Sequence, residues 1–173
     1  MRTLQELGPG LPTLARRAIE AWLGGQHLAH SDNNAPAAAV FVSLHDKSGE
    51  LRGCMGTLLP TEDDVCKETI RCAVLCASKD PRFAPITRGE LELVHIDVTV
   101  LGPLESIEGP ELLDPRRYGV TVSDARGRRG VLLPDLDGID DVATQLRVAR
   151  RKAGIGEGVP VSLHRFEALR FTE

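Results

Sequence analysis

The sequence is poor in aromatic residues and in positive charge. Its 173 residues include four Phe, one Tyr and one Trp, and the formal net charge is -4. Proteins that bind single-stranded nucleic acid combine a basic groove with aromatic stacking platforms, and duplex DNA binders need a positive face. We therefore expect no nucleic-acid partner. With so few aromatic rings, the core must consist mainly of Leu, Val, Ile and Ala.

Long hydrophobic runs are also missing. No segment approaches the roughly 20 apolar residues that a membrane-spanning helix needs, and residues 1–17 lack the apolar core of a secretory signal. We expect no membrane association and a cytoplasmic location. Cysteines stay reduced in that compartment, so all four are predicted to be free thiols. They are Cys54, Cys66, Cys72 and Cys76.

Common cofactor and metal motifs are absent as well. The chain has no Walker loop, G-x-G-x-x-G, G-x-S-x-G or H-E-x-x-H, and we expect neither a cofactor nor a metal. His27, His30 and Asp32 offer three donors, but their Asn- and Ala-rich surroundings favour a solvated loop. Cys72 and Cys76 lie one helical turn apart and supply only a pair of ligands, so core packing is the better interpretation.

Length and hydrophobic patterning indicate one domain, residues 1–173, of the α+β class. Helices are predicted over 11–23, 61–79 and 140–153. Strands are predicted over 37–44, 51–54, 93–100, 118–123, 131–133 and 161–171. Strands and helices do not alternate strictly, so we expect a mixed or antiparallel sheet flanked by helices. The unbroken apolar character of 37–44 predicts a strand that is covered on both faces.

The stretch LRGCMG, residues 51–56, places a cysteine between two glycines and two positions after an arginine. The preceding HDKSGE supplies a turn, so the stretch is predicted to return as the second strand of a hairpin. In this hairpin we expect Leu44 to face Leu51 and Phe41 to face Cys54.

Strand alternation then sends Arg52 and Cys54 to one face. Side chains at this spacing come within roughly 7 Å, so Arg52 is expected to favour a thiolate, and His45 joins this face if its strand extends by one residue. Gly53 and Gly56 allow the backbone to bend and to present N–H groups to an anion. Two interpretations stay open: an activated thiol or anion pocket, and a buried small residue flanked by glycines for packing.

The stretch DPRF, residues 80–83, follows the predicted cysteine-bearing helix directly. Pro81 and Pro85 stiffen this loop. Arg82 can grip a carboxylate or phosphate with two N–H groups, or it can cap the helix and pair with Asp80. Both interpretations are open at this point.

Four motifs in this order and spacing resemble the AMMECR-one domain family, whose prokaryotic members are often called AmmeMemoRadiSam system protein A. These motifs are LRGCMG, DPRF, LLP at 132–134 and KAG at 152–154, and the resemblance covers about residues 12–172. It implies a compact α+β protein in which a smaller sub-domain comes from the middle of the chain, near 84–130. A cleft between the two parts is the usual suggestion for an active site in this family.

The resemblance also implies partners, namely a Memo-like protein and a radical-SAM protein, whereas the family's biochemical activity is not established. The chain departs from the family at Met55, where Ile is commoner, and at Asp135, where Gln is frequent. The second departure puts in doubt any polar role assumed for that position.

Two hypotheses for the function follow, and the sequence leaves open whether the protein is an enzyme. In the first, Cys54 is the reactive group, Arg52 stabilises its thiolate and His45 carries a proton. A small-molecule substrate would be held nearby by Gly53, Gly56, Asp80 and Arg82. In the second, the protein is a non-catalytic binding module for a partner protein or a small anion, and the sulfur is incidental.

Overall fold

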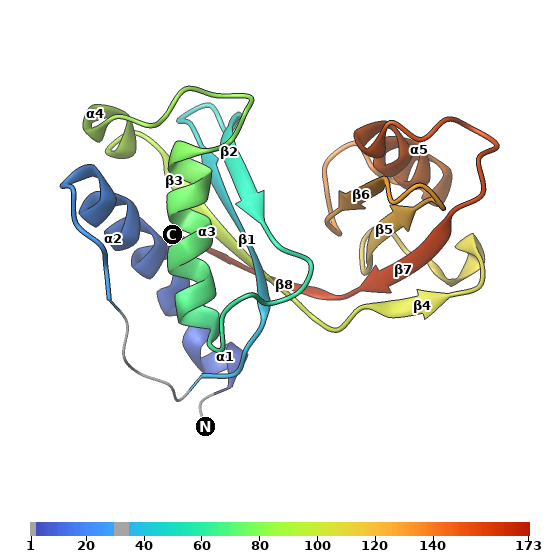
Figure 1. The fold of residues 1–173 in the computed structure, drawn as a ribbon, viewed down its shortest axis with the longest axis horizontal. Coiled ribbons are helices and arrows are strands. Elements are labelled where there is room, and N and C mark those ends of the chain that lie inside the picture. Colours follow the sequence, from blue (N-terminus) through green and yellow to red (C-terminus); the bar gives the residue numbers. More distant parts are fainter. Residues whose placement is uncertain (1–2, 30–34) are drawn as a thin grey trace. The chain divides into compact units, whose positions relative to one another are not determined.

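The computed structural model describes residues 3–29 and 35–173, which divide into two compact units. Unit 1 contains Met1–Leu101 and Leu169–Glu173, and unit 2 contains Gly102–Ala168. Each unit has its own four-stranded sheet and its own helices (Figure 1), which confirms the predicted α+β class.

Unit 1 consists of a sheet covered by helices. Its strands are β1 (Ala39–His45), β2 (Leu51–Gly56), β3 (His95–Leu101) and β8 (Ala168–Thr172). Its helices are α1 (Leu4–Leu7), the 3-10 helix η1 (Gly8–Gly10), α2 (Leu11–Leu23), α3 (Val65–Ser78) and α4 (Arg88–Leu91). The strand order is β2-β1-β3-β8, and β1 pairs antiparallel with both of its neighbours. Helix α3 packs on β1 and β2, whereas α2 packs on β3 and on α3.

Strand β1 points every second residue into the core. Val40, Val42 and Leu44 are at most 1% exposed. On the opposite face Phe41, Ser43 and His45 are only half-buried, although Ala39 at the start of the strand is buried. The strand is therefore fully covered on one face, and the expectation that both faces are covered was wrong, because the helices lie on one side.

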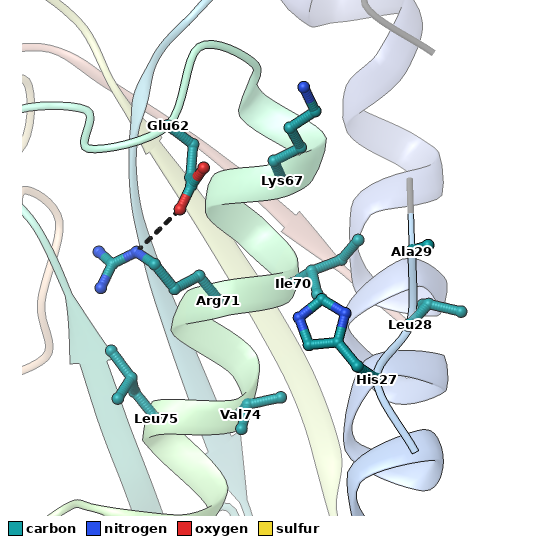
Figure 2. A pocket seen from close by; sticks show the side chains of 9 residues that line it. All are labelled: His27, Leu28, Ala29, Glu62, Lys67, Ile70, Arg71, Val74 and Leu75. Atoms are coloured by element: carbon teal, nitrogen blue, oxygen red, sulfur yellow. Dashed lines mark ion pairs between the residues drawn. The ribbon is translucent and has the colours of Figure 1, made fainter. Parts of the chain in front are cut away.

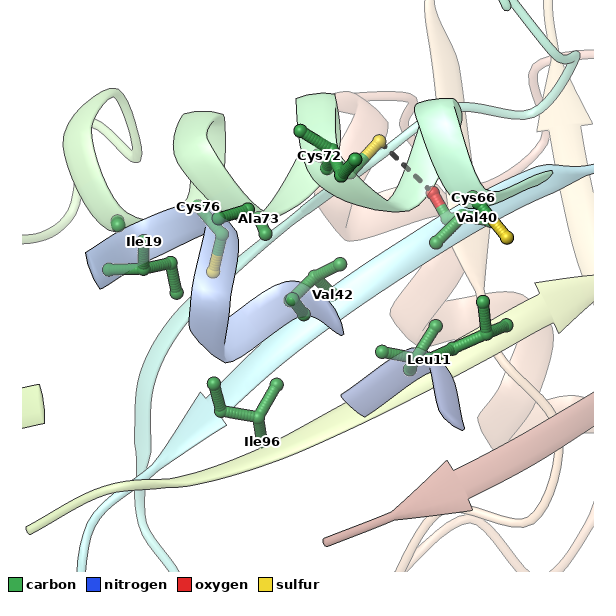
Figure 3. Close-up of a cluster of buried hydrophobic side chains, with 14 of the residues drawn as sticks. Leu11, Ile19, Val40, Val42, Cys66, Cys72, Ala73, Cys76 and Ile96 are labelled. Atoms are coloured by element: carbon green, nitrogen blue, oxygen red, sulfur yellow. Dashed lines mark hydrogen bonds between the residues drawn. The ribbon is translucent and has the colours of Figure 1, made fainter. Parts of the chain in front are cut away.

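Helix α3 turns its cysteines inward, as predicted. Cys66, Cys72 and Cys76 are at most 5% exposed, and Figure 3 shows them among the aliphatic side chains of α2 and the sheet. Burial raises the pKa of Cys72 and that of Cys76 to about 12. Figure 2 shows the outward side of the helix, where Ile70 and Val74 face the segment that follows α2. We conclude that three of the four thiols are packing residues.

The start of α3 differs from the prediction. The helix begins at Val65, and the Asp64 carboxylate caps it by accepting from the backbone N–H of Cys66 at 2.6 Å. The predicted start, Thr61, lies in the preceding loop. Thr61 does not cap the helix; its backbone N–H donates to the carboxylate of Glu68 at 2.8 Å.

Glu68 is fully buried and holds this loop on the helix. Its carboxylate accepts hydrogen bonds from the Thr57 hydroxyl, the Glu62 N–H and the Arg71 guanidinium, all at 2.8 Å. Burial alone would raise the pKa of Glu68, but these hydrogen bonds outweigh it and lower the pKa to about 2. The carboxylate therefore stays ionised in the folded protein.

A Glu68→Gln substitution is expected to lower the free energy of unfolding by about 2 kcal/mol at pH 7, because charge-assisted hydrogen bonds become neutral ones. A carboxyl whose pKa is lowered on folding contributes stability above its unfolded pKa, and this contribution disappears as the pH falls through its folded pKa. Urea unfolding at several pH values should show the difference between the two proteins shrinking from about pH 4.5 to about pH 2. A difference that stays constant would contradict the assignment.

Unit 2 has the strand order β4-β7-β5-β6 with antiparallel pairing. The strands are β4 (Glu105–Ile107), β5 (Gly119–Ser123), β6 (Arg129–Leu132) and β7 (Ser162–Phe166), and the helices are η2 (Pro110–Leu112) and α5 (Val142–Ala153). The Asp141 carboxylate caps the start of α5, and Gly154 ends it in the left-handed conformation at φ 65°. This helix packs on β5 and β6.

The boundaries of unit 2 differ from those expected for the central sub-domain near 84–130. The unit begins later, at Gly102, because α4 and β3 belong to unit 1. It also ends later, at Ala168, because α5 and β7 complete its core. The predicted segment 161–171 contains two strands, and these belong to different sheets.

Within residues 3–29 and 35–173, no helix is long and apolar enough to cross a membrane. In the same residues, no group of three or more His, Cys, Asp or Glu side chains is arranged to hold a metal ion. His27 is described and exposed, whereas His30 and Asp32 lie outside the described residues.

Candidate functional site

Cys54 lies on β2 opposite Ser43 of β1. The expected partner was Phe41, so the register differs by two residues at this point. Two changes combine: β1 extends to His45, which takes Leu51 as its partner, and a β-bulge at Arg52 then lets Leu44 pair with Gly53, so that β2 has one extra residue. A shift of two preserves the faces, so Cys54 still points away from α3.

The free edge of β2 is bound by the DPRF loop. The backbone N–H of Cys54 donates to Asp80 Oδ2 at 2.9 Å, and Arg82 Nη2 donates to the carbonyl oxygen of Cys54 at 3.3 Å. Because both backbone groups point to the edge, Ser43 and Cys54 form a non-hydrogen-bonded pair, in which side chains come closest. The Ser43 hydroxyl donates to Cys54 Sγ at 3.2 Å.

Asp80 and Arg82 form a two-pronged ion pair. Asp80 Oδ1 accepts from Arg82 Nε at 3.0 Å, and Oδ2 accepts from Nη2 at 2.7 Å. The hydrogen bonds from Arg82 lower the pKa of Asp80 to about 2, although the carboxylate is buried. Of the two interpretations of this loop, pairing within the loop is observed. The contact with the β2 backbone was not predicted, since nothing in the sequence joins these positions.

The guanidinium of Arg52 has partners other than the sulfur. Its Nε and Nη2 donate to Glu90 Oε1 at 3.1 and 3.0 Å, and Nη2 also donates to the carbonyl of Ala84 at 3.0 Å. The Phe83 ring lies 5.5 Å from this guanidinium and 5.4 Å from that of Arg82. Of the two arginines, it is therefore Arg82 that donates a hydrogen bond to Cys54, and the acceptor is the backbone carbonyl oxygen.

The two glycines of LRGCMG are required by close packing. A Cβ at Gly53 would lie 3.1 Å from both the carbonyl oxygen and Sγ of Cys76. A Cβ at Gly56 would overlap the Val40 carbonyl oxygen and the Phe41 backbone. Of the backbone N–H groups expected to face an anion here, that of Cys54 donates to Asp80.

A row of polar side chains continues from Cys54 across the outer face of the sheet. Ser43 pairs with Asp97 of β3, and His45 pairs with His95. His45 Nε2 lies 3.6 Å from Asp97 Oδ2, and His95 Nε2 lies 4.0 Å from Asp97 Oδ1. Asp97 Oδ1 is buried and has no hydrogen-bond partner among the described residues. His45 is in β1, so the condition for its joining this face is fulfilled.

Ser43 and Asp97 were not among the predicted site residues. The alternation of β3 does place His95 and Asp97 on one face, but only the pairing of β1 with β3 brings them to Ser43. Cys54 is half-buried, whereas the other three cysteines are buried. Cys54 is thus the partly accessible cysteine, its sulfur accepts a hydroxyl hydrogen bond, and an imidazole–carboxylate pair lies on the same face of the sheet.

Comparison with known proteins finds relatives of similar and of greater length. The chain is 40% identical over 165 residues to a protein of Thermotoga maritima, covering 91% of this chain and 94% of that protein. It is 41% identical over 134 residues to a protein of Clostridium acetobutylicum, covering 78% of this chain but only 28% of that longer protein.

A crystal structure of an uncharacterised protein from Pyrococcus horikoshii has the same fold. It superposes with a TM-score of 0.88 at 30% sequence identity, covering 97% of this chain and 92% of that one. Residues 12–173 match the AMMECR1 domain. The match spans both units and all four motifs, and the chain therefore belongs to the AMMECR1 family.

Proposed function

We propose that Cys54 is the nucleophile of a group-transfer site on the outer face of the unit 1 sheet. The hydrogen bond from the Ser43 hydroxyl to Sγ, at 3.2 Å, is the observation that carries this proposal. A donor on the sulfur stabilises the charge that develops when the thiol loses its proton. His45 is the proposed proton carrier; to accept this proton its imidazole must turn from its present contacts, which are the Gly49 carbonyl oxygen at 3.2 Å from Nδ1 and Asp97 Oδ2 at 3.6 Å from Nε2. The sulfur then bonds to an electrophilic carbon of a small-molecule substrate, and the leaving group departs with its electron pair and a proton from His45.

The loop DPRF supports the site in two ways under this proposal. Asp80 fixes the position of Cys54 through its backbone N–H. Arg82 is 52% exposed in its side chain, so its guanidinium also has a solvent-facing side that can orient an anionic group of the substrate. Arg52 acts from a distance, by holding Glu90 and the Phe83 ring beside the loop.

The proposal includes a cytoplasmic location and two partners. Reduced thiols suit that compartment, and the four cysteines are free. A Memo-like protein and a radical-SAM protein are proposed as partners on the family resemblance of the four motifs.

A non-catalytic binding module is the alternative function. It is favoured by the observation that packing accounts for Gly53 and Gly56, and backbone bonding for Asp80 and Arg82, without any chemistry at the sulfur. A Cys54→Ser substitution separates the two. A folded protein that loses its cellular function supports the thiol, whereas an unchanged cellular function supports the binding module.

The reactivity of the thiol can be tested by alkylation. We expect iodoacetamide at pH 7 to label Cys54 alone and faster than cysteine in an unstructured peptide, because the other three thiols are buried. Ser43→Ala should slow the labelling about tenfold, which corresponds to the loss of one hydrogen bond of about 1.4 kcal/mol. Ser162→Ala, at an exposed serine of unit 2, is the matched control and should leave the rate unchanged. A rate no faster than that of the peptide would remove the proposal.

A further inference from the structure

We propose that the open face of the unit 2 sheet binds the phosphate group of a small monoester. The open face is the side of this sheet that points away from α5. Arg129 of β6, Ser123 of β5 and Ser162 of β7 form one row across it, because Ser123 pairs with both of the others. In the next row on the same face, Thr121 of β5 pairs with His164 of β7.

The packing of α5 establishes which side chains point to the open face. A Cβ at Gly130 would overlap the carbonyl oxygen of Ala149 in α5, so Gly130 faces the helix. Val122, the partner of Gly130 in β5, belongs to the same buried cluster as Ala149. Because successive side chains of a strand alternate between its two faces, Arg129 and Ser123 point away from α5.

The first row is accessible to a ligand. Arg129 and Ser162 are exposed, and Ser123 is half-buried. The Asp124 N–H donates to the Arg128 carbonyl oxygen at 3.1 Å, so the adjoining pair of Ser123 and Arg129 is a non-hydrogen-bonded pair, in which side chains come closest. A ligand can therefore reach a guanidinium and two hydroxyls that three neighbouring strands hold in place.

The charges on the open face favour an anion. Among the described residues, the side chains of Arg129 and His164 have no hydrogen-bond or ion-pair partner. The side chains that the four described strands of unit 2 send to this face include no carboxylate. Asp124, the acidic residue of the adjoining turn, pairs with Arg128 at 2.7 Å. The positive charge of Arg129 is thus complementary to an anion that comes from outside the chain.

The donors of the open face suit a phosphate better than a carboxylate. The guanidinium of Arg129 offers two parallel N–H groups to an oxyanion. The hydroxyls of Ser123 and Ser162 and the imidazole of His164 add further donors. A phosphate monoester carries close to two negative charges and three strong acceptor oxygens, and a carboxylate has one charge and two oxygens. A phosphate can therefore use more of these donors at once.

Val131 is the reason for assigning an ester. It follows Arg129 by two residues on β6, so it points to the same face, and it is half-buried. An alkyl group on the phosphate would remove apolar surface of Val131 from water, which inorganic phosphate cannot do.

The open face is independent of the proposed thiol site. Its residues belong to unit 2, whereas Ser43, Cys54 and Asp97 belong to unit 1. Binding to the open face is measured without reference to the reactivity of the thiol. Failure of either proposal therefore leaves the other intact.

NMR titration with propyl phosphate at constant ionic strength tests the site. We expect saturable shifts of the backbone amide signals of Ser123, Arg129 and Ser162, with a dissociation constant on the order of millimolar for so small a ligand. The ring signals of His164 and the methyl signals of Val131 should move with them. Acetate should bind about ten times more weakly, and inorganic phosphate about three times more weakly.

The outcomes separate the parts of the proposal. The absence of saturable shifts with propyl phosphate, or equal binding of acetate, would overturn the phosphate site. Equal or tighter binding of inorganic phosphate would overturn the assignment of an ester.

Two arginine variants separate a specific contact from a general effect of charge. Arg129→Gln should weaken the binding of propyl phosphate about tenfold, because the two-pronged contact is lost. Arg151→Gln is the matched control: it removes the same charge from an exposed residue near the end of α5, on the other side of the sheet, and should change the affinity less than about twofold. Equal losses in the two variants would contradict the assigned contact.

Discussion

An Asp80→Ala protein is expected to unfold with a free energy about 4 kcal/mol lower than that of the parent protein. The substitution removes four hydrogen bonds at once: both prongs of the ion pair with Arg82 and the acceptors of the Cys54 and Arg82 backbone N–H groups. Asp80 is only 4% exposed, so no bulk water replaces the lost carboxylate at low cost. Urea unfolding followed by circular dichroism measures the change.

Arg82→Ala is the matched control for this experiment. It leaves the buried Asp80 carboxylate with only the backbone N–H donors of Cys54 and Arg82, so we expect a loss of about 2 kcal/mol, smaller than that of Asp80→Ala because both N–H groups keep their acceptor. The pH dependence supplies a second check, because the folded pKa of Asp80 is lowered to about 2. Its contribution is complete above the unfolded pKa, near 4, and is lost as the pH falls towards 2. Equal losses in the two variants would show that the carboxylate does not anchor β2.

Gly56→Ala is expected to lower the free energy of unfolding by about 3 kcal/mol. The new Cβ would overlap the Val40 carbonyl oxygen and the backbone of Phe41, so relief requires movement of β1 against β2. Neither neighbour is the end of a flexible side chain, and a small rotamer change cannot make room. Thermal and urea unfolding would both detect a loss of this size.

Gly89→Ala is the control, because Gly89 is a glycine with room for a methyl group. A Cβ at Gly89 would meet nothing within 4 Å, and the residue lies in α4, so the change should be neutral or slightly stabilising. If Gly56→Ala proved equally mild, the close approach of β1 and β2 would have no part in selecting this glycine.

The positions and buried faces of the helices were predicted well where the spacing of apolar residues alone determines them. The spacing of apolar residues placed α2 at Leu11–Leu23 with both ends, and the inner stripe of α3 put Cys72 and Cys76 in the core. These features depend on local geometry, 3.6 residues per turn and a glycine or proline at the end. They need no knowledge of distant residues.

The candidate site was predicted only in part, because its contacts join distant segments. Arg52 was predicted to share a face with Cys54 by alternation, but it lies in the bulge, and its partner Glu90 is 38 residues away with no pattern to link the two. The extension of β1 to His45 and the bulge in β2 together shift the register by two residues, which places Ser43 and not Phe41 opposite Cys54. The hydroxyl on the sulfur therefore became visible only with the strand pairing.

The burial of a charged side chain was the other feature that the sequence did not predict. Glu68 sits one turn into α3 and looks like any exposed acidic residue of a helix, yet it is fully buried. Its place is determined by Thr57, Thr61 and Arg71 acting together. Each contact is modest, and only the complete set compensates a buried carboxylate.

The last strand, β8, has a consequence for the order in which the chain is made. Unit 1 needs it, since Phe171 covers Gly8 and the Glu173 carboxylate accepts from Arg16 Nε at 2.6 Å. Unit 2 is complete at Ala168. A ribosome thus delivers the whole of the inserted unit before it delivers the final segment of the unit that encloses it. The earlier part of unit 1 therefore waits, with the β3 edge of its sheet unpaired, until β8 has been synthesised.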